Sequence, residues 1–136
     1  MEFFLAPTQL QRLKKLGVGV VYLFGSYAED KHHPLSDVDI GIAFLGAGIP
    51  RRSSGEVYNE LYDIFTDLFP GKSVDIIFLE NAGLELRFDA ITHGRFIYEH
   101  SREGRLQFEE KTTLLYADFK PLLDEFDDAV LGRISA

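Results

Sequence analysis

Residues 18–42, VGVVYLFGSYAEDKHHPLSDVDIGI, decide the fold because they hold two apolar runs separated by a polar segment. The first run, 18–24, is rich in β-branched and aromatic residues and ends at Gly25. The second run, 38–44, has the same character and is closed by a glycine-rich segment. Short apolar runs of this composition, bounded by turn residues, predict buried β-strands rather than helices. Two interior strands are therefore expected at the centre of the domain.

The rest of the chain alternates helical and strand signals around this pair. Leucines at a spacing of three follow Thr8, which predicts a first helix capped by Thr8 and stopped by Gly17. Beyond residue 44 we expect a helix from Ser53 or Ser54 to Pro70, a strand over 73–79, a helix ended by Gly94, an edge strand over 95–98 and a helical tail over 101–134 that Pro121 kinks or divides.

This pattern and the length predict one domain. The chain has 136 residues, the size of a single ordinary domain, and 46% of them are hydrophobic. Strands alternating with helices predict an α/β (α+β) fold, a small mixed sheet flanked by helices. We expect a single domain over 1–136, with a core over 1–100 and a helical C-terminal tail over 101–136.

Charge and composition exclude several classes of function. Fourteen basic against 22 acidic residues give a net charge of −8, which disfavours direct binding to nucleic acid. The absence of cysteine excludes disulfides, thiolate metal sites and cysteine nucleophiles, and agrees with a reducing compartment. The sequence has neither a visible export signal nor a span of about 20 apolar residues. We therefore expect a cytoplasmic protein with no membrane partner.

Three aspartates are the candidate chemical groups. Asp37 and Asp39 lie two residues apart at the start of a predicted strand, so both side chains share one face of it. Asp75 is an acid within the apolar strand 73–79, where an unpaired charge would be costly to bury. If these strands are neighbours, the carboxylates form a cluster suited to Mg²⁺ bound together with phosphates, or to accepting a proton.

A phosphate-binding turn is the second candidate feature. Gly25 and Ser26 directly follow a strand, where backbone amides can approach a phosphate closely and a hydroxyl can add a hydrogen bond. Each feature also has a plain structural explanation: Gly25-Ser26 as an ordinary turn, Asp37 and Asp39 as a strand cap and a solvated acid, and Asp75 as the first exposed position of its strand.

Together these residues resemble a known family. Gly25-Ser26, ten intervening residues and Asp37-Val38-Asp39 are similar to the signature of minimal nucleotidyltransferases (MNT) of the DNA polymerase beta superfamily. Asp75 in its strand and the segments Thr92-His93-Gly94 and Phe96-Ile97-Tyr98-Glu99 extend the resemblance. The tail around 116–123 resembles the adenylyltransferase antitoxins of HEPN/MNT toxin–antitoxin pairs.

The resemblance implies a function and a role for each matching residue. It implies Mg²⁺-dependent transfer of AMP from ATP to a hydroxyl, here a tyrosine of a cognate HEPN ribonuclease toxin. Gly25 and Ser26 would hold the triphosphate, and Asp37 and Asp39, with Asp75 completing the cluster, would bind the Mg²⁺ ions, two being expected. Asp75 would also activate or orient the attacking hydroxyl.

The loop after Ser26 departs from the family pattern, because two acids, Glu29 and Asp30, stand where many relatives have basic residues. Lys31, His32 and His33 follow, and Arg51, Arg52, Arg87 or Arg95 are other candidates to contact the phosphates. Two alternatives stay open: a non-catalytic antitoxin that masks its toxin, and a nucleotidyltransferase acting on a small molecule. The apolar positions of the tail, including Leu114, Leu122 and Phe126, either pack on the chain's own core or contact a partner.

Overall fold

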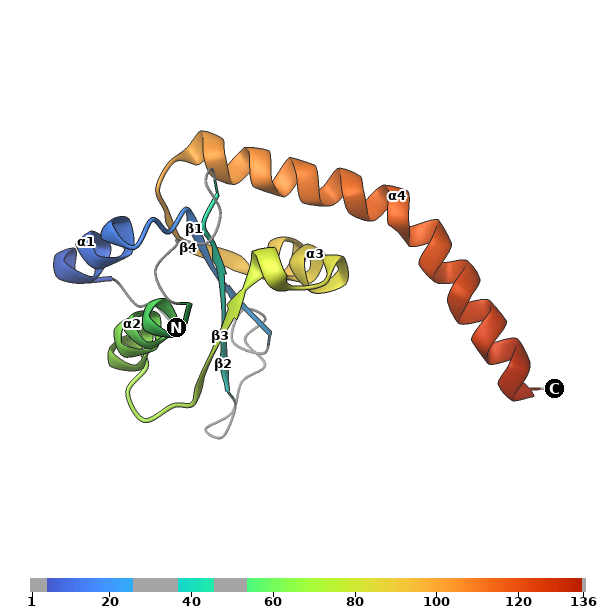
Figure 1. Ribbon diagram of the computed structural model, residues 1–136, viewed down its shortest axis with the longest axis horizontal. Helices are drawn as coiled ribbons and strands as arrows, with labels where there is room; N and C mark the ends of the chain where they lie inside the picture. The colour runs from blue at the N-terminus through green and yellow to red at the C-terminus, as the bar shows by residue number, and fades with distance from the viewer. Residues whose placement is uncertain (1–4, 26–36, 46–53, 136) are drawn as a thin grey trace.

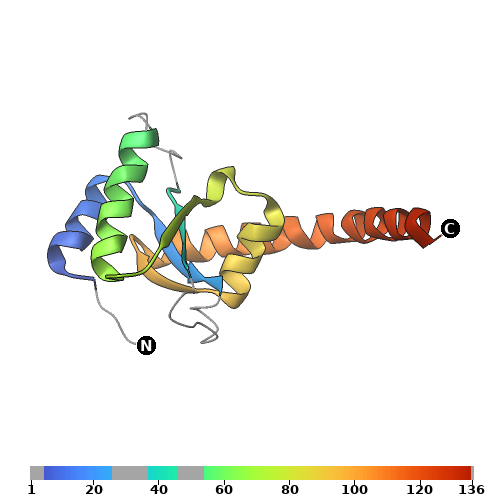
Figure 2. The same cartoon turned by 90° about the horizontal axis from the view of Figure 1, so that it is seen from below.

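A computed structural model describes residues 5–25, 37–45 and 54–135. A four-stranded sheet stands between two helical layers, and one long helix extends from the second layer away from the body (Figures 1 and 2). This is the α+β fold expected from the sequence, with its flanking helices and its helical C-terminal tail.

The sheet has the order β3-β2-β1-β4. β1 (Val20–Phe24) runs antiparallel to both β2 (Val38–Ala43) and β4 (Arg95–Glu99), whereas β3 (Val74–Phe78) runs parallel to β2. Parallel neighbours require a crossover, and α2 (Ser54–Leu68) supplies it. The predicted strands are confirmed, including the edge position of β4, and the strand that carries Asp75 pairs with the one that carries Asp39, which the sequence left open.

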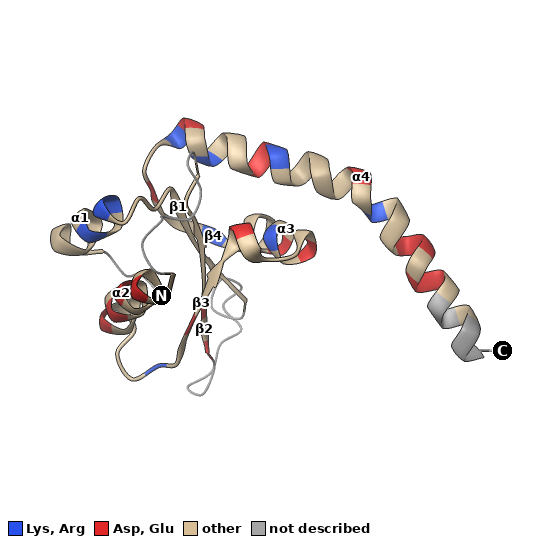
Figure 3. Cartoon of the chain, viewed as in Figure 1, with Lys and Arg blue, Asp and Glu red and all other residues tan. Residues whose placement is uncertain are grey.

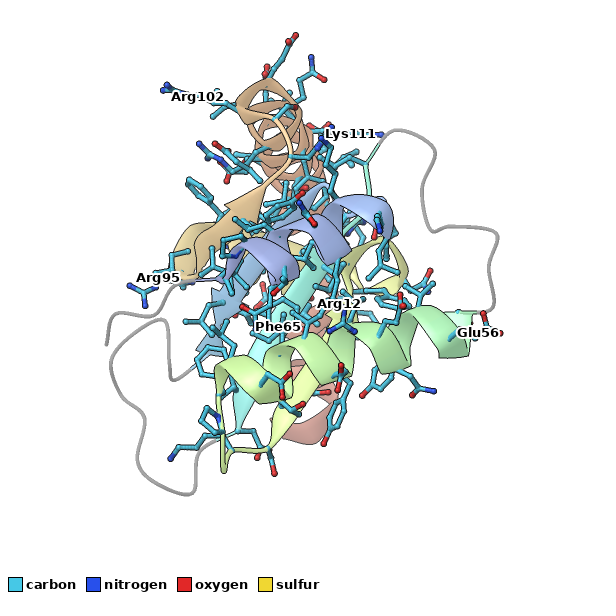
Figure 4. The ribbon with its side chains drawn as sticks, turned by 90° about the vertical axis from the view of Figure 1, so that its left-hand side faces the viewer. Arg12, Glu56, Phe65, Arg95, Arg102 and Lys111 are labelled. Carbon is cyan, nitrogen blue, oxygen red and sulfur yellow. The ribbon has the colours of Figure 1, made fainter. Side chains whose placement is uncertain are left out.

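The first face of the sheet is covered by α1 (Pro7–Lys15) and α2, and the larger hydrophobic core lies beneath them. Phe65 of α2 is fully buried and lies between its helix and the strands (Figure 4). Because side chains alternate along a strand, one face of β2 supplies three fully buried residues to this core, Val38, Ile40 and Ile42.

The second face is covered by α3 (Leu84–His93) and the start of α4 (Arg102–Ser135). Tyr22 and Phe24 point into this smaller core, together with Leu79 from the 3₁₀ turn η2 (Leu79–Asn81). Gly41 lets the 3₁₀ turn pack closely on the centre of this face, because a Cβ added there would stand only 3.2 Å from Leu79 Cδ1.

The start of α1 differs from the sequence expectation, whereas at Pro121 the bend, one of the two expected outcomes, is present. α1 begins at Pro7, one residue before Thr8, and Ala6 N–H donates to Gln9 Oε1 at 2.7 Å. Proline is favoured at the first helical position because its missing N–H would have no partner there, so Thr8 as the cap was wrong. Pro121 does not divide the tail: α4 is one 34-residue helix that contains it and bends along its length.

The root of α4 is fastened to the sheet by a polar cluster. Tyr22 Oη donates to Glu109 Oε1 at 2.9 Å, and Arg105 donates from Nε to Glu99 Oε2 at 2.6 Å and from Nη1 to Glu109 Oε1 at 3.1 Å. The Arg105 guanidinium also lies 4.0 Å from the centre of the Phe96 ring. Burial, and then the charge of Glu109, raise the pKa of the Tyr22 hydroxyl, which therefore stays protonated and keeps donating.

No helix within the three described ranges combines the length and the apolar character needed to cross a bilayer.

We predict that Arg105→Ala lowers the free energy of unfolding by about 1–3 kcal/mol, because two partly buried carboxylates lose their shared donor. Urea denaturation measures the loss. Arg102→Ala is the matched control: Arg102 is exposed one turn earlier in the same helix, and its removal should change stability by less than about 0.5 kcal/mol. Equal effects of the two substitutions would show that the cluster does not hold α4.

Candidate active site

Strand register brings the predicted site residues to one end of the sheet. Asp39 lies opposite Phe24 on β1 and beside Asp75 on β3. Gly25 directly follows Phe24, and Asp37 directly precedes β2. The three aspartates and Gly25, which are up to 50 residues apart in sequence, are therefore neighbours in the fold.

Alternation along the strands decides which way the acids point. Val38 and Ile40 are buried under α2, so Asp39 between them points to the opposite face, where α3 and α4 lie. Asp75 likewise stands between two residues of the first core, and it is exposed. The predicted shared face of Asp37 and Asp39 follows from this alternation.

The electrostatics at Asp39 are unfavourable to its own charge. Burial raises the pKa of the Asp39 carboxyl above its ordinary value, and the negative charges of Asp75 and then Asp37 raise it further. Asp39 therefore stands at the centre of a site that accumulates negative charge. A cation bound there would relieve this repulsion.

Gly25 touches this carboxylate directly. Its φ of +72° lies in the left-handed region, and a Cβ built on it would overlap Asp39 Oδ2. Both the backbone conformation and the space exclude other residues. This contact distinguishes Gly25 from an ordinary turn glycine such as Gly71, which has φ +77° and no atom within 4 Å of an added Cβ.

The end of α3 also packs against this end of the sheet, which the sequence did not predict. A Cβ on Gly94 would stand 2.8 Å from Leu23 O and 3.0 Å from Phe24 Cβ, so only glycine lets the helix end approach β1 so closely. The only sequence signal was the position of Gly94 as a helix stop. Arg95 follows it and pairs in register with Leu23, two residues before Gly25.

Arg87 and Arg95, two of the arginines that the sequence offers as phosphate contacts, lie at different ends of the sheet. Arg95 stands at the site end of its edge strand and points outward from the sheet (Figure 4). Arg87 lines a hollow of about 430 Å³ with Leu45 and Glu80, at the opposite end of β2 from Asp39. Six residues of extended strand separate the two ends by roughly 20 Å, so Arg87 is not a residue of this site.

Several predicted residues lie outside the described ranges. They are Ser26, Glu29, Asp30, Lys31, His32, His33, Arg51 and Arg52.

The donor set suits a hard divalent cation that is shared with a ligand. Within the described ranges, no group of three or more His, Asp or Glu side chains is placed to hold a metal ion. Mg²⁺ does not need such a group, because it is commonly held by one or two carboxylates together with substrate phosphates. The chemistry of Asp37, Asp39 and Asp75, the close contact of Gly25 and the raised pKa of Asp39 all fit such an ion.

Residues 10–103 match the family described as "Polymerase beta, Nucleotidyltransferase". This match covers more than half of the chain and includes Gly25 and all three aspartates. The chain therefore belongs to the polymerase beta-type nucleotidyltransferase family. Comparison with curated proteins gives no match.

Solved structures with the same fold come from toxin–antitoxin complexes. A chain of a toxin–antitoxin crystal structure with AMP-PNP has a TM-score of 0.68 and 22% identity, over 91% of this chain and 97% of that one. A chain from the complex of tri-AMPylated Shewanella oneidensis HEPN toxin with MNT antitoxin has a TM-score of 0.62 and 20% identity, over 91% and 97%. A chain of the MntA–HepT complex has a TM-score of 0.60 and 20% identity, over 93% and 99%.

We predict that Gly25→Ala lowers stability by more than Gly71→Ala does. The strained backbone should cost about 1–2 kcal/mol at either position, and only at Gly25 must a carboxylate also move. Denaturant unfolding of both variants measures the difference. The excess should disappear in an Asp39→Ala background, and an excess that persists there would contradict the contact.

Stability should also depend on pH through Asp39. Its pKa is raised in the folded state, so the folded protein binds more protons than the unfolded chain and is destabilised as pH rises from 3.8 through the folded-state pKa. Without added metal, Asp39→Asn should therefore be more stable than the parent at pH 7, and the gain should shrink towards pH 4. Thermal unfolding across this range tests the sign, and a variant less stable than the parent at pH 7 would contradict the electrostatic account.

Proposed function

We propose that this chain is a Mg²⁺-dependent adenylyltransferase that transfers AMP from ATP to a tyrosine hydroxyl of a cognate HEPN ribonuclease toxin. The modification would block the toxin, so the chain acts as an antitoxin, in the cytoplasm. Support comes from family membership and from fold similarity to chains of toxin–antitoxin complexes, one with AMP-PNP and one with an AMPylated HEPN toxin.

The observation that carries the proposal is the placement of Asp39 between Gly25 and Asp75. The backbone of Gly25 lies against the Asp39 carboxylate, and we propose that amides of the turn that begins there face the same point as the acids. Amides of this kind favour a phosphate, and a cluster of acids favours a cation. A nucleoside triphosphate with its Mg²⁺ satisfies both requirements at once.

The chemistry is an in-line displacement at the α-phosphorus of ATP. The acceptor oxygen forms a bond to phosphorus, the bond from phosphorus to the pyrophosphate oxygen breaks, and the acceptor proton leaves. Asp75 is exposed beside Asp39, so it can accept that proton or orient the hydroxyl that carries it. Gly25 and Ser26 hold the triphosphate in line for attack.

Asp37 and Asp39, with Asp75 completing the cluster, would hold the divalent ions, two being the number we propose. When bound, these ions neutralise charge on the entering and leaving oxygens. Asp39 contributes most directly, because its carboxylate touches Gly25 and its partial burial keeps water from screening it.

Replacing either metal-binding acid should abolish transfer without unfolding the protein. We predict that Asp37→Asn and Asp39→Asn each reduce AMP transfer to the HEPN partner by at least about 100-fold, because each removes a charge that holds the cation. Intact-mass measurement of the partner after incubation with ATP and Mg²⁺ counts the AMP groups added. Either variant retaining parental activity would refute the metal assignment.

Asp67→Asn is the matched control for these variants. Asp67 is an exposed aspartate of α2, the helix on the other face of the sheet, so its substitution should leave transfer unchanged. The same measurement separates the alternatives. A parent that binds the HEPN protein but never adds AMP is the non-catalytic antitoxin, and AMP transfer to a small molecule in place of the partner identifies the third class of function.

A further inference from the structure

An apolar seam runs along α4 and continues past the end of the body. The seam consists of Phe108, Thr112, Leu115, Tyr116, Phe119, Leu122, Leu123 and Phe126. At 100° per residue these positions fall within an arc of about 120° on the helix. The seam is therefore a single continuous face.

Most of the first half of this seam is already covered by the chain itself, and Leu115 is its one residue that stays 40% exposed. Phe108 packs into the core on the α3 side, Thr112 is 2% exposed, and Tyr116 stacks on Phe88 of α3 with ring centres 3.9 Å apart. This half shows that the seam is a packing surface. It also fixes the direction in which the seam points, which is toward α3.

The second half has the same pattern and no cover from the described residues. Phe119 is 39% exposed, Leu122 60% and Phe126 67%, so packing on the chain's own core, one of the two outcomes that the sequence left open, does not account for these positions. Leu122 and Phe126 continue the spacing of three and four that brings Thr112 and Tyr116 onto α3. A contact surface thus continues for roughly 15 Å beyond Tyr116.

Pro121 bends α4 so that the free half of the seam faces the same side of the molecule as the covered half. It lies on the side of the helix opposite the seam and lacks the N–H that would bond to Ala117 O. A proline bends a helix away from itself, so the seam lies on the inner side of the bend. Figure 1 shows α4 arching over α3 with its inner side toward that helix.

The charges beside the free half favour one kind of occupant. Asp118 and Asp127 flank the seam on its two sides, at about 100° and 80° from its centre, and the lysine of this stretch, Lys120, pairs with Asp124 at 3.2 Å (Figure 3). A second copy of the chain placed seam to seam would bring acids against acids, which is repulsive. A helix with an apolar face and basic flanks would cover the seam without this repulsion, because its basic residues attract the acids.

We infer that the free half of the α4 seam is the docking surface for an amphipathic, basic-flanked helix of the protein that the site modifies. The identity of that protein as the HEPN toxin rests on the proposed function. Asp39 and Asp75 point to the face of the sheet that α3 and α4 cover, so a partner held by the seam lies on the side of the sheet where its hydroxyl must arrive.

Two leucines of α4 give a matched test. Leu122 in the seam is 60% exposed, and Leu114, roughly 140° from the centre of the seam, is 59% exposed. Calorimetric titration with the purified HEPN protein that the proposed function assigns as partner should show Leu122→Asp weakening binding by about 30-fold or more. Leu114→Asp should change it by less than about 3-fold, and circular dichroism checks that both variants keep their helix content.

Charge reversal provides a second variant that leaves the apolar face intact. Asp127→Lys, at an acid that borders the seam, should weaken binding of the same HEPN protein and reduce the dependence of affinity on salt. Unchanged binding by Leu122→Asp, equal losses from the two leucine variants, or a parental homodimer that Leu122→Asp dissociates in sedimentation would each overturn the inference.

Binding and transfer are measured separately, so the two proposals can fail separately. Parental AMP transfer combined with seam-independent binding refutes the docking surface and leaves the enzyme. Seam-dependent binding without AMP transfer refutes the enzyme and leaves the docking surface. With both correct, Leu122→Asp raises KM for the partner and keeps kcat, whereas Asp39→Asn loses kcat and keeps binding. A parent that neither binds nor modifies the HEPN protein refutes both.

Discussion

The pairing of Asp39 with Asp75 across two parallel strands is the constraint on which the site depends. Register fixes the backbone of these two residues side by side, and Gly25 on the other side leaves the room that the Asp39 carboxylate occupies. The fold thus partly buries Asp39 and holds like charges beside it, and burial first and then these charges raise the pKa of the Asp39 carboxyl. This repulsion lowers the stability of the folded protein, and a bound cation with its phosphate ligand would relieve it.

A second constraint links that site to the rest of the chain through α4. Tyr22, two residues before Phe24 on β1, donates to Glu109, and Arg105 joins the same carboxylate to Glu99 on β4. The strand that ends at the candidate active site therefore also fixes the root of the long helix. Because α4 is fastened there, its apolar seam has a defined direction relative to Asp39. Catalysis and partner capture would share one rigid frame.

Local signals predicted most of the elements and the site, whereas contacts between distant segments stayed hidden. The apolar runs at 18–24 and 38–44 predicted interior strands, and the two-residue spacing of Asp37 and Asp39 predicted their shared face. Side-chain identity could not reveal that Gly25 abuts Asp39 or that Gly94 abuts β1, because those contacts depend on strand order. The sequence likewise named Arg87 and Arg95 as equal candidates, and only the fold places them at opposite ends of the sheet.

The central claim is that Asp37, Asp39 and Gly25 together hold a divalent cation and its nucleotide. A crystal structure of the protein with Mn²⁺ and a non-hydrolysable ATP analogue tests it most directly, because manganese is located by its anomalous scattering. The account predicts an anomalous peak between the carboxylates of Asp37 and Asp39, with the triphosphate against Gly25. Manganese and nucleotide bound elsewhere, with these carboxylates free of both, would contradict it.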